Sequence, residues 1–176
     1  NEYVPPIDEF EQYSKSIDIT STETLEDAID MLEGINPMPD KQRAIRNLRE
    51  LIDVTESEKG VVITLESDDL FDSGDAEIHP SRVEVLDAIA MLFRYATNDV
   101  LIMGHTDSVP TRGGRFESNW ELSVYRALSV LYYMTDAAGL DPERLAAGGF
   151  GDRIPLYPNN TEENRSKNRR VEFILK

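Results

Sequence analysis

The sequence predicts an α/β sandwich, in which helices pack on one mixed β-sheet with the element order β-α-β-α-β-β and one or two extra helices before it. Three observations predict this class. Short apolar runs rich in Val, Ile and Leu recur between polar segments, as buried strands do. The stretches between them carry apolar residues at i, i+3, i+4 and i+7, which is the spacing of one helix face. A length of 176 residues, with 40 % hydrophobic and 30 % charged residues, suits one ordinary domain with an appendage.

Two amphipathic helices are expected first. One stripe predicts a short helix over 23–33, which Gly34 is expected to end. Asp40 is expected to cap a second helix that continues to about Thr55. The apolar residues of the two stripes are Leu25, Ala28, Ile29 and Leu32, and then Ala44, Ile45, Leu48, Leu51 and Ile52.

The sheet and the helices that cover it are expected after Gly60, which breaks the second helix. The predicted elements in order are a strand over 61–65, an acidic turn over 68–75, a helix from Pro80 or Ser81, a strand over 100–104, a loop over 105–118, a helix over 119–138, a short strand over 144–149, a polar loop, and a last strand over 170–175.

Charge divides the chain. Residues 1–40 hold eleven acidic residues and one basic residue, whereas residues 41–176 hold 23 acidic and 17 basic residues. We therefore expect a linker region over 1–59, with one or two helices, and a domain over 60–176. The helix over 23–33 is either docked on the main body or part of a segment that rearranges or meets a partner. An acidic segment bounded by prolines favours the docked connector.

Composition excludes several classes of function. The net charge of −16 disfavours binding to nucleic acid or to anionic lipid. The chain has no cysteine, so it has no disulfide, catalytic thiol or cysteine-ligated metal. No run approaches the roughly 20 apolar residues of a membrane helix. A start at Asn1 without a signal sequence is expected of a processed chain or an excised fragment.

We expect no metal or other cofactor. The acidic residues between 66 and 75 lack the spacing of a calcium-binding loop, so a solvated turn is expected there. His79 and His105 lack the spacing of metal ligands. No nucleophile with an activating base is apparent, which argues against an enzyme and for a chain without catalytic residues.

The residues that carry chemistry lie in the loop after the second strand and in the helix that follows. Asn119, Leu122 and Arg126 are spaced to form one edge of that helix, while Trp120 belongs to a face suited to core packing. An arginine near a helix start can hold a carboxylate, and Asp107 at the neighbouring strand end could hold an ammonium. The pattern favours a site for a zwitterion. The alternative is that Asp107 and Arg126 pair only with each other.

Residues 164–170 add four cations immediately before the last strand. In an otherwise acidic chain, a local pocket for an anionic ligand fits them better than nucleic acid does. Since side chains alternate along a strand, Arg169 and Arg170 are expected to point in opposite directions, so that at most one reaches the site.

The sequence contains four ordered motifs: Gly104-His105-Thr106-Asp107, Asn119-x-x-Leu122-Ser123-x-x-Arg126-Ala127, Gly149-Phe150-Gly151-x-x-x-Pro155 and Asn168-Arg169-Arg170-Val171. Together these motifs resemble the OmpA-like peptidoglycan-binding domain over roughly 60–176. Upstream of them, Leu70-Phe71-Asp72-Ser73-Gly74 with Ile78 and Pro80 is similar to the entry motif of that family. The loop from Asp107 to Asn119 is longer than the common family pattern. Within the family, Pro110 and the segment 118–123 look most like the MotB/PomB stator proteins of the flagellar motor.

The resemblance implies an OmpA-like fold and non-enzymatic binding of the diaminopimelate of the peptidoglycan stem peptide. Asp107 and Arg126 would hold its zwitterionic end. Carried over residue by residue, the expected ligand-binding set is Thr106, Asp107, Asn119, Leu122, Arg126 and Arg169.

As a stator subunit, the protein would anchor an ion-driven torque generator to the cell wall. Its expected partners are peptidoglycan, a second copy in a homodimer, and a MotA/PomA-like membrane subunit contacted through a part upstream of Asn1. Its expected location is the periplasmic part of an inner-membrane protein of a Gram-negative bacterium. The alternatives are an OmpA-like anchor of another envelope complex, such as a secretion-system component or a lipoprotein, and a peptidoglycan-processing enzyme.

Overall fold

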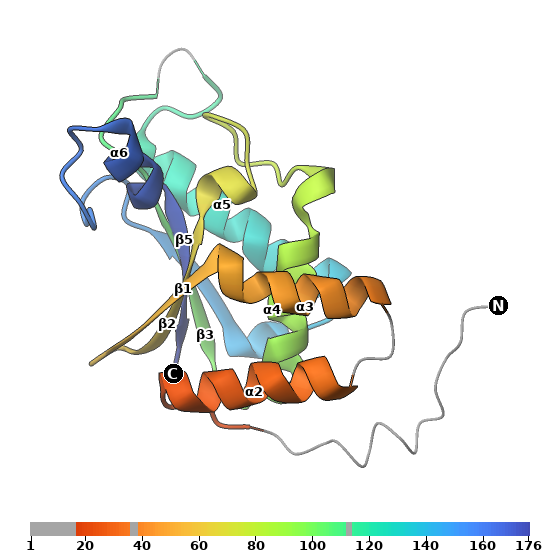
Figure 1. The fold of residues 1–176 in the computed structure, drawn as a ribbon. Helices are drawn as coiled ribbons and strands as arrows, with labels where there is room; N and C mark the ends of the chain where they lie inside the picture. Colours follow the sequence, from red (N-terminus) through yellow and green to blue (C-terminus); the bar gives the residue numbers. More distant parts are fainter. Residues whose placement is uncertain (1–16, 36–38, 112–113) are drawn as a thin grey trace.

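The computed structural model describes residues 17–35, 39–111 and 114–176. Within them the chain forms five α-helices and a five-stranded mixed sheet (Figure 1). The elements are α2 (Thr22–Ile35), α3 (Pro39–Leu51), β1 (Ile52–Ser57), β2 (Gly60–Glu66), α4 (Glu84–Tyr95), β3 (Val100–His105), α5 (Asn119–Tyr132), β4 (Leu145–Gly149), α6 (Glu162–Asn168) and β5 (Arg170–Leu175).

The predicted α/β class is confirmed, and the sheet has the strand order β1-β2-β5-β3-β4. Only the pair β3–β4 is parallel, while β5 runs antiparallel to both β2 and β3. The strand that comes last in the sequence is therefore the centre of the sheet. Figure 1 shows α2 to α5 gathered on one side of the sheet and α6 next to the start of β5.

The predicted second helix is too long. It begins at Pro39 and ends at Leu51, and the next six residues form β1, which pairs antiparallel with β2. The alternation in β1, with Ile52 buried and Val54 half-buried, fits a strand with one face on the core. Gly34 does not end the first helix, which continues to Ile35.

The turn from β1 into β2 requires glycine. Gly60 has φ = 116°, and a Cβ on it would lie 2.1 Å from the carbonyl oxygen of Leu175. Both the positive φ and the close approach of β5 exclude a side chain there.

Two further differences lie near the end of the chain. The predicted polar loop before the last strand contains a short helix, α6, whose first turn is capped by Thr161 through its hydroxyl and the N–H of Asn164. The predicted helix over 119–138 is α up to Tyr132 and then widens to a π-turn over Tyr133–Ala137.

Helix α5 lies unusually close to the sheet. A Cβ on Gly104 would meet the carbonyl oxygen of Ser123 at 2.1 Å, and one on Gly149 would meet its Oγ at 2.3 Å. The Ser123 hydroxyl also accepts a hydrogen bond from the N–H of Gly151. The glycines of β3 and β4 thus let the first turns of α5 rest directly on the strand ends.

The N-terminal helices belong to the same core as the sheet. Leu25 and Ile29 of α2 and Leu48 of α3 are fully buried in one apolar cluster with Phe93 and Phe173. The expected boundary between 59 and 60 falls at the turn of the β1–β2 hairpin. None of the helices in the described ranges has the length and apolar character needed to cross a membrane.

Candidate functional site

The expected ligand-binding residues gather where β3 ends and β5 begins. His105, the last residue of β3, pairs in register with Arg170, the first residue of β5. Asp107, two residues after the end of β3, and Arg169, immediately before β5, therefore meet. The Arg169 Nη1 donates to Asp107 Oδ2 at 2.7 Å.

Asp107 is almost closed off from solvent, with 10 % of its side chain exposed. Its Oδ1 accepts a hydrogen bond of 3.0 Å from the N–H of Val109. The backbone around it is fixed by its neighbours, because Thr106 Oγ1 donates to the Asp107 carbonyl and Asn119 Nδ2 donates to the carbonyls of Asp107 and Val109. Thr106 and Asn119 therefore hold the loop in this structure.

Arg169 is the centre of a cluster of carboxylates. Besides Asp107, its guanidinium contacts Asp68 at 2.9 Å and Glu162 at 2.7 Å. The hydrogen bonds that Arg169 donates to Asp68 contribute most to raising its pKa, and those that it donates to Asp107 and Glu162 add to them against the effect of burial. As predicted, the Arg170 side chain points away from this cluster, and it donates to the carbonyls of Asn168 and Ile154.

Arg126 is buried on the inner edge of α5 and is 3 % exposed. Its Nε donates to the carbonyl of Asp75 at 2.7 Å, its Nη2 donates to that of Asp72 at 3.2 Å, and its guanidinium lies 5.1 Å from the ring centre of Phe71. Burial lowers the pKa of Arg126 to about 10, so the side chain remains charged at neutral pH.

One nitrogen of Arg126 is available to a ligand. Its Nη1 has no hydrogen-bond partner within the described ranges. It is also not among the unpartnered side-chain atoms that are sealed from solvent there. A guanidinium that is fixed by two backbone carbonyls and leaves one N–H group free is positioned to receive a carboxylate.

The alternative in which Asp107 and Arg126 pair only with each other is wrong, because the carboxylate of Asp107 pairs with Arg169. Asp107 and Arg126 still lie within electrostatic range of each other. Leu122 is buried against Ala76 and Phe116. Trp120, expected in the core, is 51 % exposed.

A buried ionic network lies directly behind the strand ends. Arg170 is 1 % exposed and donates to Glu172 at 2.8 Å and to the carbonyls of Asn168 and Ile154. His105 Nε2 lies 3.4 Å from Glu172, and neither ring nitrogen of His105 makes a hydrogen bond in the described part of the chain. Burial lowers the pKa of His105. Burial alone would raise the pKa of Glu172, but His105 and Arg170 outweigh it and lower it to about 2.

The sequence interpretation missed the carboxylates that hold Arg169. Asp68 was assigned to a solvated turn, and Glu162 lies in a helix that was not expected. Asp68 comes to Arg169 because the N–H of Ser67 donates to the Arg169 carbonyl, which aligns the end of β2 with the start of β5. Strand register, which the sequence does not reveal, is what brings Asp68 to Arg169.

Comparisons with known proteins show the family of the chain. The model of the OmpA family matches residues 70–169, which is more than half of the chain. Motility protein B of Bacillus subtilis is 33 % identical over 145 residues, covering 82 % of this chain and 56 % of that protein. The chain spans about half the length of the curated relatives it matches.

Two solved structures are similar along most of their length. A MotB-like protein from Desulfovibrio vulgaris superposes with a TM-score of 0.72 at 32 % identity, covering 88 % of this chain and 94 % of that one. The cell wall anchor of the type VI secretion system from Pseudomonas aeruginosa superposes with a TM-score of 0.68 at 32 % identity, covering 74 % and 92 %. With the family match over 70–169, the sheet order and the motif residues at the strand ends, these likenesses place the chain in the OmpA family.

Proposed function

We propose that this chain binds peptidoglycan without cleaving it and anchors the stator of a flagellar motor to the cell wall. The observation that carries the binding proposal is the Nη1 of a fixed, buried Arg126, which makes no hydrogen bond to the described residues and lies within electrostatic range of the Asp107 carboxylate. The likeness to motility protein B and to a MotB-like structure supports the stator role.

The ligand would be the free zwitterionic end of the diaminopimelate in the stem peptide. Its carboxylate would bind Arg126 Nη1, and its ammonium would bind Asp107. Arg169 now occupies Asp107, but Asp68 and Glu162 also hold Arg169, so it can yield one Asp107 oxygen and remain paired. Thr106, Asn119 and Leu122 would shape the cradle around these charges.

Each charge-assisted hydrogen bond of this kind contributes about 1.5–3 kcal/mol, so a single site is expected to bind weakly. A homodimer would strengthen the hold, because the second site binds at high effective concentration. A MotA/PomA-like membrane subunit would be the ion-conducting partner, and the chain would be the periplasmic part of an inner-membrane protein of a Gram-negative bacterium.

A second candidate is an anchor for another envelope complex. The likeness to the cell wall anchor of the type VI secretion system and to the probable lipoprotein YiaD of Escherichia coli favours it. The residues upstream of Asn1 decide between the two. A membrane helix with an acidic residue would support the stator, whereas a lipobox cysteine would support the lipoprotein.

The binding site is tested by retention on purified sacculi. Asp107→Asn keeps the shape of the side chain and removes its charge, so we expect at least a tenfold loss of retention, in line with about 1.5–3 kcal/mol per charge-assisted contact. Glu163→Gln, on the exposed face of α6 nearby, is the matched control and should bind as the wild type does.

Thermal unfolding of both variants separates binding from folding. Retention of Asp107→Asn at the wild-type level would overturn the assignment of Asp107. Release of soluble muropeptides from sacculi by the wild type would overturn the non-enzymatic role and support the processing enzyme.

A further inference from the structure

His105 is a buried imidazole that makes no hydrogen bond to the described residues. It is the last residue of β3 and is 2 % exposed. Both of its ring nitrogens are sealed from solvent and lack a partner there. A buried polar group without a partner destabilises the fold, and native proteins keep few such groups. The binding of peptidoglycan as derived above does not use this side chain, although it lies two residues before Asp107.

The imidazole lies beside a buried ion pair. Arg170, which pairs with His105 in the sheet register, donates from Nε to Oε1 of Glu172 at 2.8 Å. The other oxygen of this carboxylate, Oε2, lies 3.4 Å from Nε2 of His105. Phe150, which follows β4, stacks on the imidazole with ring centres 5.5 Å apart and brings no charge. Glu172 therefore turns one oxygen towards a guanidinium and the other towards an imidazole.

The charges of this group balance only while His105 is neutral. Arg170 and Glu172 carry opposite charges, so a proton on the imidazole leaves a net charge of +1 in a place with little access to water. Burial lowers the pKa of His105 most. Glu172 opposes this effect, while the charges of Arg170 and of Lys59, in the turn between β1 and β2, add to it.

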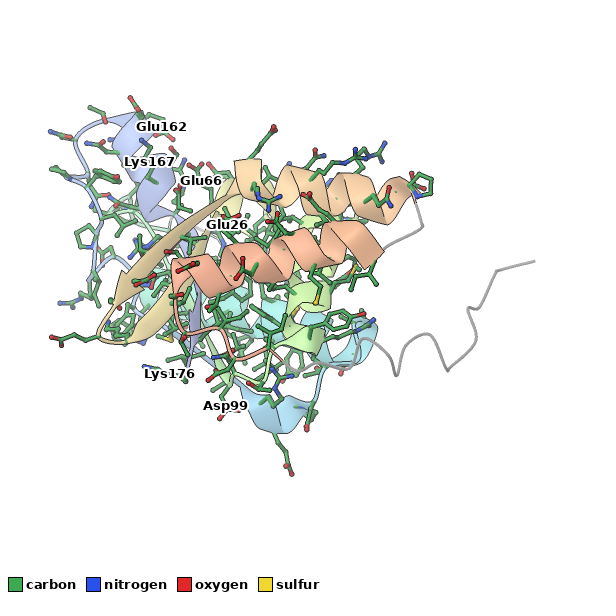
Figure 2. All side chains as sticks on the ribbon, turned by 60° about the horizontal axis from the view of Figure 1, so that its bottom comes forward. Glu26, Glu66, Asp99, Glu162, Lys167 and Lys176 are labelled. Carbon is green, nitrogen blue, oxygen red and sulfur yellow. The ribbon has the colours of Figure 1, made fainter. Side chains whose placement is uncertain are left out.

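The group lies at the end of β5 that is next to the candidate site. Figure 2 shows Glu162 and Lys167 of α6 at one end of the molecule and Lys176, the residue after β5, at the other. Arg170 and Glu172 are the first and third residues of β5, so they lie at the α6 end.

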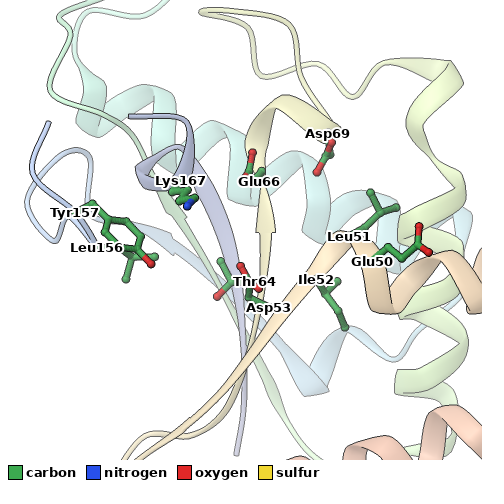
Figure 3. Close-up of a pocket in the computed structure, with 10 residues that line it drawn as sticks. All are labelled: Glu50, Leu51, Ile52, Asp53, Thr64, Glu66, Asp69, Leu156, Tyr157 and Lys167. Atoms are coloured by element: carbon green, nitrogen blue, oxygen red, sulfur yellow. The ribbon is translucent and has the colours of Figure 1, made fainter. Parts of the chain in front are cut away.

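Arg170 also holds the chain segment that precedes α6. Its Nη2 donates to the carbonyl of Ile154 at 3.0 Å, and its Nη1 donates to the carbonyl of Asn168 at 3.2 Å. The buried side chain of Asn168 in turn accepts the backbone N–H groups of Leu156 and Tyr157. Figure 3 shows these last two side chains together on the segment.

The same segment is bonded to the loop that carries Asp107. The Asn168 Nδ2 donates to Oδ1 of Asn159 at 2.9 Å, and this oxygen also accepts the N–H of Ser108 at 3.3 Å. Ser108 directly follows Asp107, and Arg169, the partner of Asp107, directly follows Asn168. Hydrogen bonds therefore connect the buried group with both sides of the Asp107–Arg169 pair.

We propose that His105 is a positioning residue of the peptidoglycan site and that its protonation weakens this site. The inference rests on the proposed function. With His105 neutral, Glu172 holds Arg170, and Arg170 holds the segments around Asp107. The imidazolium would compete with Arg170 for Glu172, and the excess positive charge would push the two cations apart. The ends of β3 and β5 would then separate, and Asp107 and Arg169 would lose the geometry that binds the ligand.

Retention on purified sacculi between pH 7.5 and pH 5 tests the proposal. The wild type should lose about fivefold to tenfold in affinity over this range, because one linked proton changes an equilibrium by at most about tenfold per pH unit. The loss should begin below pH 6.5, since the pKa of His105 is lowered from that value. Histidine is the side chain whose ordinary pKa lies in this range, and the chain has two, His79 and His105.

Two variants separate these histidines. His105→Gln keeps an amide near the position of the ring nitrogen and gains no proton, so its retention should change less than about twofold over the same range. His79→Gln is the matched control. His79 accepts the N–H of Ser81 and takes no part in the hydrogen bonds around Arg170, so this variant should keep the pH profile of the wild type.

An NMR titration of the wild type without ligand depends neither on the folding of a variant nor on the proposed function. The ring signals of His105 are followed together with the amide signals of Ser108, Leu156 and Tyr157, which lie along the hydrogen-bonded path. All of them should change with one midpoint below pH 6.5.

Three results would overturn the proposal. One is a loss of retention in His105→Gln that is as steep as in the wild type. Another is an imidazole of His105 that stays unprotonated down to pH 5. The third is an imidazole that titrates while the amide signal of Ser108 does not change. An absence of retention at every pH would instead contradict the proposed function, and the NMR titration would still decide whether His105 controls the loop.

Discussion

Three arginines near the strand ends, Arg126, Arg169 and Arg170, are all largely buried, but they have different hydrogen-bond partners and therefore different roles. Arg170 is enclosed by Glu172 and two carbonyls and has a structural role. Arg169 is shared among three carboxylates. Arg126 is fixed by backbone carbonyls, and its Nη1 makes no hydrogen bond to any residue in the described part of the chain. Helical spacing predicted Arg126, and strand alternation predicted that Arg169 and Arg170 diverge. The partners of each depend on register and could not be predicted.

Because the pKa of Glu172 is lowered in the folded state, the free energy of unfolding depends on pH. Its pKa of about 2 in the folded state is below the ordinary value of 4.5, so its ionised form stabilises the fold above pH 4.5 and this contribution is lost as the pH falls towards 2. The shift corresponds to at most about 3 kcal/mol.

We therefore expect Glu172→Gln to be clearly less stable than the wild type at pH 7, where it leaves Arg170 buried without a countercharge. The difference should shrink steadily below pH 4.5. Chemical denaturation at several pH values measures it. A difference that is constant from pH 7 to pH 2.5 would contradict the assigned role.

At the scale of elements, the sequence predicted the long, periodic helices and the apolar strands, and it failed at β1 and α6. Ile52 continues the stripe of α3 and so extends the predicted helix, while the β-branched alternation that follows is a weaker signal. Helix α6 has seven residues without an apolar face, so its local signals are the N-cap Thr161 and the charges of its first and last turns. Helix α6 brings Glu162 to Arg169, and this carboxylate was missed because α6 was not expected.

The contact of α5 with β3 yields a prediction on glycine. Gly104→Ala places a methyl group 2.1 Å from a backbone oxygen of α5, so α5 must shift, and we expect a loss of about 3 kcal/mol in unfolding free energy. Gly34→Ala, in α2 with open space around the new methyl, should instead stabilise by about 0.5–1 kcal/mol. Urea denaturation compares the two substitutions. A neutral or stabilising effect of Gly104→Ala would contradict the close approach of α5 to β3.

At the scale of the whole molecule, the N-terminal helices complete one continuous core. The charge distribution predicted a linker region over 1–59, separate from the domain. The charged residues lie on the surface, however, and do not reveal that the apolar residues of α2 are buried in the same core. Thr22 of α2 donates to Glu56 of β1, and Ile19 donates its N–H to Asn98, next to β3. The docked alternative for the helix over 23–33 is therefore the one seen in this structure.

Truncation tests this shared core. A chain of residues 60–176 lacks β1 and exposes apolar residues under α2 and α3, so we expect it to aggregate or to unfold at a much lower temperature than the whole chain. A chain of residues 39–176 keeps α3 and β1 and should have intermediate stability. Calorimetry of the three chains gives the order. Equal melting temperatures would show that 60–176 folds by itself.

The place of β5 between β2 and β3 also governs when the sheet can form during synthesis. The β1–β2 hairpin and the β3–β4 pair have no hydrogen bonds to each other and are joined only through β5. Until the ribosome has released the six residues of β5, the nascent chain carries two half-sheets with unpaired edges. Unpaired strand edges can pair with the wrong strand. Assembly must therefore wait until translation of β5 is finished, and a chaperone that shields those edges would act in that interval.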